Sequence, residues 1–219
     1  MKQKEKISPT QKALNVWAVI LIVWAIYRAK VHQSEAFDEF IAKPLVFILP
    51  VWYYIRRYEH KNFFEAVDLK VKNLKSDVLY GLGIGGIFFI SALLATFMRS
   101  GLGGWNHGFT VEKVMLLVAT ALATAISEEI LSRGFILKRL YEESKNVYTS
   151  TFFASILFFF LHVPILFTDP KINGNLLLMF MMTDLVLSIT NSFIFLSRRS
   201  LVLPILIHAF YNLAIVFFL

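Results

Sequence analysis

Long runs of apolar residues alternate with short polar and basic stretches along the whole chain. An α-helix needs about 20 apolar residues to cross a membrane, and most of the runs approach or reach that length. The second run is short for a crossing, so its helix either begins earlier in the sequence or is tilted. We therefore expect seven or eight transmembrane helices. The apolar segments are 13–28, 40–55, 78–98, 113–137, 148–168, 174–197 and 201–219.

The composition supports an all-α polytopic membrane protein. The chain has 219 residues, of which 57% are hydrophobic, and its mean hydropathy of +0.63 lies outside the range of ordinary soluble domains. No soluble domain, linker or internal repeat stands out, so residues 1–219 are expected to form a single membrane domain. The absence of cysteine excludes disulfides, thiolate metal sites and a cysteine nucleophile.

The positive charge is distributed in a way that favours lipid over nucleic acid as its partner. The net charge is +7, but the lysines and arginines lie in short clusters between the apolar segments. When loops are assigned to alternate sides of the membrane, most of these residues fall on the side of the N-terminus. The positive-inside rule then predicts a multi-pass protein of the cell membrane with a cytoplasmic N-terminus.

Three charged residues, Glu128, Glu129 and Arg133, interrupt the fourth apolar segment. On a helix, Glu129 and Arg133 are four residues apart and share a face, whereas Glu128 points about 100° away. Arg133 can therefore neutralise Glu129, and Glu128 is left without a local partner. A charge at the centre of a membrane helix costs about 2.5–3.5 kcal/mol, so this helix is expected to line a polar site.

Two histidines, His162 and His208, also fall inside apolar segments. With a rise of about 1.5 Å per residue, both lie at a depth similar to that of Glu128 in the predicted topology. Asn212 follows His208 by one helical turn on the same face. We therefore expect four polar side chains from three helices to line one cavity in the inner half of the bilayer.

This group suits the hydrolysis of an amide. Glu128 could act as a general base on a water molecule held with His162, while His208 and Asn212 stabilise the oxyanion of a tetrahedral intermediate. Alternatively, Glu128, His162 and His208 are enough ligands for a catalytic zinc. HExxH, GxSxG and GxGD motifs are absent. A GxGxxG match at Gly81 lies inside an apolar segment, and its glycines are expected to serve helix packing rather than nucleotide binding.

Three short motifs resemble those of the CAAX-protease and bacteriocin-processing (CPBP or Abi) family of intramembrane proteases, which includes the Ras-converting type of prenyl-protein endopeptidase. They occur in order on successive apolar segments, and the family-like core spans about 113–219. The motifs are EExxxR at Glu128, Glu129 and Arg133, FxxxH at Phe158 and His162, and HxxxN at His208 and Asn212.

The resemblance implies an α-helical bundle, usually of eight helices, with an intramembrane active site open to the inner face. It implies that Glu128 and His162 activate water and that His208 and Asn212 stabilise the oxyanion. The other motif residues, Glu129, Arg133 and Phe158, would support the site. We favour a site without metal or other cofactor, because Asn212 is a good donor but a poor ligand.

The expected substrate is a membrane protein or peptide, and the expected roles are bacteriocin self-immunity or peptide maturation. Two alternatives to a protease remain. One is a non-proteolytic immunity or scaffold protein, and the other is a proton-coupled transporter that uses Glu128 and His162 as a relay. The concentration of acidic residues on one helix argues against a relay. Asp184 matches no family motif and is expected near the outer interface or in a pair.

Overall fold

The computed structural model describes residues 7–31, 33–100, 110–168 and 174–218. All regular elements in these ranges are helical, which confirms the all-α class. The basic residues Lys2, Lys4 and Lys6, expected on the inner side, lie outside the described residues. The helices are α1 (Pro9–Lys30), α2 (Glu35–Phe37), η1 (Asp38–Ala42), η2 (Pro44–Ile48), α3 (Leu49–Tyr54), η3 (Ile55–Glu59), α4 (Phe63–Ala66), α5 (Leu74–Ser100), α6 (Val111–Glu129), η5 (Ile130–Leu137), α7 (Lys138–Ser144), α8 (Val147–Thr168), α9 (Gly174–Arg198) and α10 (Val202–Phe218).

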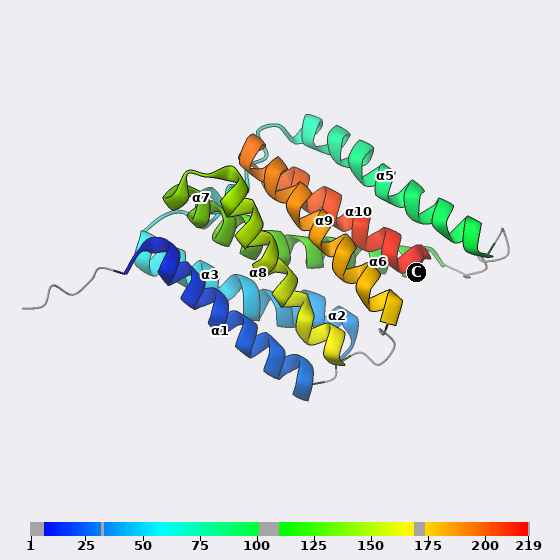
Figure 1. Cartoon of the computed structure of the whole chain (residues 1–219), viewed down its shortest axis with the longest axis horizontal. Helices are drawn as coiled ribbons and strands as arrows, with labels where there is room; N and C mark the ends of the chain where they lie inside the picture. Colours follow the sequence, from blue (N-terminus) through cyan, green and yellow to red (C-terminus); the bar gives the residue numbers. More distant parts are fainter. Residues whose placement is uncertain (1–6, 32, 101–109, 169–173, 219) are drawn as a thin grey trace, which may run out of the picture.

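Each of the seven apolar segments is helical, and consecutive segments run in opposite directions through one bundle (Figure 1). The second segment is longer than its apolar run suggested, because α2, η1, η2, α3 and η3 follow one another without a break from Glu35 to Glu59. The first and fourth segments begin at side-chain caps: the hydroxyl of Ser8 accepts a hydrogen bond from Gln11, and that of Thr110 accepts one from Lys113. Such caps satisfy backbone donors at a helix start.

Five of the described helices are long and apolar enough to cross a membrane, and α10 is a shorter apolar helix. The protein is therefore a multi-pass membrane protein. The segment Glu35–Glu59 is not among the five, and it carries Glu39 and Lys43 within its length. The five candidate spans are Pro9–Lys30, Leu74–Ser91, Val111–Ser144, Val147–Pro164 and Leu178–Arg198.

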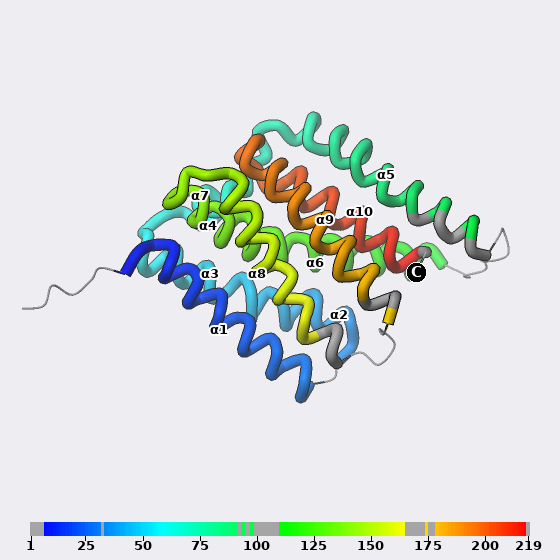
Figure 2. The backbone as a smooth tube through the Cα atoms, in the orientation of Figure 1, coloured from blue at the N-terminus to red at the C-terminus, as the bar shows by residue number. Residues whose placement is uncertain are grey.

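One end of the bundle gathers four connecting regions that are far apart in sequence, and Figure 2 shows the start of α1, α4 and α7 at that end. The Thr10 hydroxyl donates to the backbone oxygen of Arg139 at 3.0 Å, and Arg139 in turn pairs with Glu59 at 2.7 Å. The backbone N–H of Leu201 donates to the backbone oxygen of Asp68 at 3.0 Å. These contacts place the connecting regions at the same end of the bundle. The charge pattern had assigned the same regions to one side of the membrane.

The glycines of α5 let this helix approach α10 closely. A Cβ atom at Gly85 would lie 2.6 Å from the ring of Phe210, and one at Gly81 would lie 2.9 Å from Leu206. By contrast, a Cβ at Gly83 or Gly86 would meet nothing within 4 Å. The packing role expected of the GxxxG pair is therefore present, and it brings the helix that carries His208 against α5.

Candidate active site

The two adjacent glutamates at the end of α6 are both buried and point toward different partners. Glu128 is 4% exposed and Glu129 is fully buried. The backbone continues into η5, so successive side chains still turn by about 100°. As a result, one helix turn supplies two carboxylates to two networks that share His208.

Glu129 lies at the centre of the first network. Its Oε1 atom accepts hydrogen bonds from Arg133 at 3.0 Å and from Asn191 at 3.0 Å, and it lies 2.9 Å from Nδ1 of His208. The pair of Glu129 and Arg133 expected from their spacing is present. Asn191 also donates to the backbone oxygen of Pro204, so it ties α9 to the start of α10.

Glu128 lies at the centre of the second network. Its Oε2 atom lies 3.4 Å from Nε2 of His162 and 3.6 Å from Nε2 of His208. Its Oε1 atom accepts a hydrogen bond from Nζ of Lys43 at 2.8 Å. Glu128 has no local partner, as expected, but it does have a distant charged one. Its partner lies 85 residues earlier in the chain, and helical spacing reveals only partners within a turn or two.

The two imidazoles are oriented by the acceptors at their Nδ1 atoms. Nδ1 of His162 lies 3.2 Å from the backbone oxygen of Phe158, and Nδ1 of His208 faces Glu129. Both acceptors require an N–H at Nδ1, which directs both Nε2 atoms toward Glu128. The Phe158 ring packs against His162 and His208 at centroid distances of 4.7 and 5.8 Å, and the Arg133 guanidinium lies 4.4 Å from the same ring.

Asn212 is the one expected site residue whose place differs from that of the others. The structure brings Glu128, His162 and His208 together, whereas the Asn212 Nδ2 atom is buried and has no hydrogen-bond partner among the described residues. Its side chain lines a cavity of about 180 Å³ together with Glu39. A buried donor without a hydrogen-bond partner lowers the stability of the fold. A group that enters the cavity would accept a hydrogen bond from this amide and remove that cost.

Two acidic residues from other helices were missed as members of the site. Glu39 of η1 pairs with Lys43 at 2.8 Å and accepts a hydrogen bond of 2.5 Å from Thr124. Asp184 of α9 accepts a hydrogen bond from Tyr211 at 2.9 Å and lies 4.0 Å from Nε2 of His162. Asp184 is thus paired, as expected. In the sequence, both residues could have been found as acids that lie within or beside an apolar segment.

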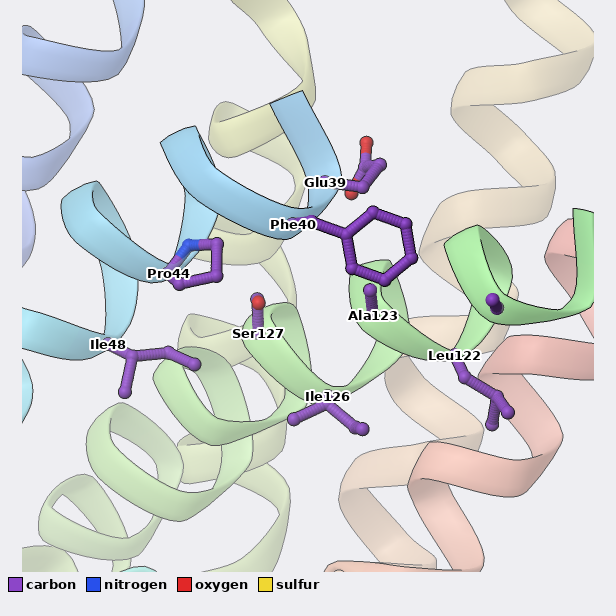
Figure 3. A pocket seen from close by; sticks show the side chains of 9 residues that line it. Glu39, Phe40, Pro44, Ile48, Leu122, Ala123, Ile126 and Ser127 are labelled. Carbon is purple, nitrogen blue, oxygen red and sulfur yellow. The ribbon is translucent and has the colours of Figure 1, made fainter. Parts of the chain in front are cut away.

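A larger apolar cavity of about 370 Å³ opens beside this network, between η1, η2 and α6. Figure 3 shows Glu39, Phe40 and Pro44 on one helix facing Ala123 and Ser127 on the other. Ser127 directly precedes Glu128 in the sequence. The cavity therefore borders the charged network at Glu39, and Glu128 itself is not among its lining residues.

Within the ranges that the structure describes, no three histidine or acidic side chains are placed to hold one ion. The ammonium group of Lys43 also lies in direct contact with Glu128, and a cation in that position opposes the approach of a second one.

The fold and the site together define an all-α polytopic membrane protein with a buried cluster of carboxylates, imidazoles and cations inside its helix bundle. Residues 110–214 match a known family, described as type II CAAX prenyl endopeptidase Rce1-like. This part of the chain, which contains Glu128, His162, His208 and Asn212, is therefore similar to that family. The family resemblance found in the three motifs is thus confirmed, and it points to a protease. Neither the curated proteins nor the solved structures gave a match.

Proposed function

We propose that the protein is an intramembrane endopeptidase in which Glu128 and His162 activate a water molecule for attack on a peptide bond. The observation that carries this proposal is the convergence of Glu128 Oε2 on the Nε2 atoms of His162 and His208, at 3.4 and 3.6 Å. The match to a family of endopeptidases over residues 110–214 supports the same reaction class.

The hydrogen-bonding capacity of the three groups favours a bound water. Oε2 of Glu128 is buried and has no hydrogen-bond partner among the described residues. With its proton at Nδ1, a neutral His162 presents a lone pair at Nε2, whereas a charged His208, placed against Glu129 and Glu128, carries an N–H at Nε2 as well. A water molecule can then donate its two hydrogens to Glu128 and His162 and accept a hydrogen bond from His208. Such a water is held next to its base before the substrate arrives.

In the proposed reaction, each of these groups acts at a defined step. The water oxygen forms a bond to the peptide carbonyl carbon while its proton passes to Glu128 or His162. His208 in its charged form and the Asn212 amide donate hydrogen bonds to the resulting oxyanion. A single such donor contributes about 3–4 kcal/mol in a site that excludes water. The C–N bond then breaks, and the proton taken from the water is delivered to the leaving amine.

We further propose that this chemistry uses no metal. The alternative is a zinc ion held by Glu128, His162 and His208. Against it stands the ammonium of Lys43 on Glu128, and Asn212, the last polar residue of the three motifs, carries an amide rather than a usual zinc ligand. The amide is better suited to donate a hydrogen bond to an oxyanion than to bind zinc.

The proposed substrate is a membrane protein or a hydrophobic peptide that reaches the site from within the bilayer. The proposed location is the cell membrane, with the N-terminus and the end of the bundle that carries α4 and α7 on the cytoplasmic side, because the basic loops lie there. Bacteriocin self-immunity and peptide maturation are the roles that we propose from the resemblance. Because the basic residues lie in short clusters between apolar segments, we propose lipid rather than nucleic acid as their partner.

One observation favours a second function. The argument that the acids lie on one helix was wrong, because Glu39, Glu128 and Asp184 come from three different segments and His162 lies between two of them. Acids and a histidine in a row are also typical of a proton relay in a transporter. An immunity or scaffold protein with this fold would catalyse no reaction. It would therefore not require the contacts among Glu128, His162 and Asp184.

The test is cleavage of membrane peptides by the purified protein in detergent or liposomes. We expect the wild type to release fragments and Glu128→Ala to release none, while Glu142→Ala, which changes an exposed acid on α7, cleaves normally. Proton flux into protein-containing liposomes is measured in parallel. Flux that requires Glu128, without any cleavage, would support the transporter and reject the protease.

A further inference from the structure

Lys43 is a buried cation in the middle of the second helical segment. Its side chain is 4% exposed, and its Nζ atom lies 2.8 Å from Glu39 and 2.8 Å from Glu128. Glu39 is one turn earlier on the same helix, whereas Glu128 belongs to α6. The ammonium group therefore bridges two helices that are distant in sequence.

Burial of an ammonium group is costly, and Glu39 alone already supplies a partner at the i,i+4 spacing. The second contact, with Glu128, thus needs its own explanation. A charged residue inside a membrane bundle commonly marks a functional site. Here the residue contacts the carboxylate that the proposed mechanism uses as its base.

The effect of this contact follows from the geometry of a carboxylate. The terminal torsion of a glutamate side chain is broad, so an unrestrained carboxylate samples many orientations. Lys43 holds Oε1 of Glu128, and this leaves Oε2 directed at His162 and His208. An adjacent positive charge also favours the ionised form of a carboxylate, which is the form that can accept a proton.

We propose that Lys43 is a positioning residue that orients Glu128 and keeps it ionised, so that the segment Glu35–Glu59 completes the active site. This inference rests on the proposed function. Lys43 lies outside the family match at residues 110–214. The matched domain by itself therefore holds the reacting groups but lacks the cation that sets the orientation of the base.

The test compares two variants that differ only at position 43. Glu39→Gln is the reference, and Lys43→Met is added to it, so that the double variant loses one cation and one carboxylate and keeps the net charge of the wild type. We expect its kcat to fall roughly 100-fold below that of the reference, as for a misoriented catalytic group, with little change in KM. Lys43→Arg, which keeps a cation, should retain more activity than the double variant.

A second measurement does not depend on cleavage. Dicyclohexylcarbodiimide is an apolar reagent that modifies protonated carboxyl groups, and the cavity lined by Glu39 and Ser127 can hold it one residue away from Glu128 in the sequence. Peptide mass spectrometry should find Glu128 unlabelled in the wild type and the reference and labelled in the double variant. Arg28→Met is the matched control, because it removes the ion pair of Arg28 with Asp38 beside the same helix and leaves Lys43 in place.

The possible outcomes distinguish the role of Lys43 from the proposed function of the protein. If the reference and the double variant cleave at equal rates, or if loss of Lys43 raises the rate, Lys43 does not position the base. If Glu128 stays unlabelled in the double variant, Lys43 does not keep it ionised. If the wild type cleaves nothing but labelling of Glu128 appears on loss of Lys43, the proposed function fails while the role of Lys43 in holding that carboxylate stands.

Discussion

Nδ1 of His208 lies 2.9 Å from Oε1 of Glu129. This contact joins the last helix of the bundle to the second of the two adjacent glutamates, while the other nitrogen of the same ring faces Glu128. The two carboxylates thus act on one imidazole from opposite sides. The roles of these two glutamates can be separated by substitution.

Glu128→Gln should abolish cleavage without loss of folded protein. The amide keeps the shape of the side chain but cannot accept the proton, and a missing general base lowers rates by roughly 10²- to 10⁴-fold. Lys43 keeps Glu39 as a partner in this variant, so no cation is left alone. The measurements are cleavage per molecule and yield from membranes. Normal cleavage, or a specific loss of folded protein, would show that Glu128 is not the base.

Glu129→Gln should destabilise the protein as well as inactivate it. Its Oε1 atom receives hydrogen bonds from Arg133 and Asn191, and Arg133 is 1% exposed. Breaking a buried ion pair from one side costs about 3–5 kcal/mol. Thermal unfolding in detergent should show a lowered Tm, and Arg133→Ala should lower it similarly. A Tm equal to that of Glu128→Gln would contradict the supporting role of Glu129.

Gly85→Ala should weaken the packing of α5 on α10, because the added methyl group would lie 2.6 Å from the Phe210 ring. Overpacking of this kind costs about 1–3 kcal/mol. Gly83→Ala is the matched control, since its Cβ would meet nothing within 4 Å. Thermal unfolding of both variants checks the prediction. Equal stability of the two would mean that α5 does not rest on α10 as described.

Chelation should leave proteolysis unchanged if Glu128 and His162 activate water without a metal. We expect equal cleavage rates before and after treatment with a strong chelator and removal of bound ions by dialysis. Because Asn212 is proposed as a donor, Asn212→Ala should lower kcat by roughly 10²- to 10³-fold, as does loss of an oxyanion donor elsewhere. Loss of activity on chelation, restored by added zinc, would instead support the three-ligand metal site.

Asp68, in the loop between α4 and α5, should make stability depend on pH in the acid range. Burial acts to raise the pKa of this carboxyl, but hydrogen bonds from Lys138 and Lys70 outweigh it, and the pKa is lowered from 3.8. A lowered folded-state pKa stabilises the folded protein above pH 3.8, and this stabilisation is lost as the pH falls below that value. Asp68→Asn tolerates the positive φ of 56° at this position. The variant should therefore be less stable than wild type at neutral pH, with the difference shrinking below about pH 4.

Helical periodicity accounts for much of what the sequence predicted about the fold and the site. The seven apolar segments, the Glu129–Arg133 pair and the similar depth of Glu128, His162 and His208 all follow from local spacing and from a constant rise per residue. These properties depend on one helix at a time. They need no knowledge of which helices are neighbours.

Contacts between helices could not be predicted in the same way. Lys43 was visible as a charge inside an apolar segment, but nothing in its own segment indicates that Glu128 lies across from it. The same holds for Asn191, whose amide donates a hydrogen bond to Glu129. It also holds for Asp184, whose carboxylate accepts a hydrogen bond from Tyr211. The i,i+4 spacing puts Asn212 on the same face of α10 as His208, but it does not say that this amide lines a cavity with Glu39.

The bridge from Glu39 through Lys43 to Glu128 also has a consequence for biosynthesis. The ribosome makes Lys43 long before Glu128, so the second segment must enter the bilayer while its later partner does not yet exist. An unpaired lysine at the centre of a membrane helix would cost about 2.5–3.5 kcal/mol at that moment. Glu39 is already one turn away and can neutralise the ammonium group during insertion. When the fourth segment follows, Glu128 docks against a cation that has entered the membrane together with Glu39, which stays its partner in the folded protein.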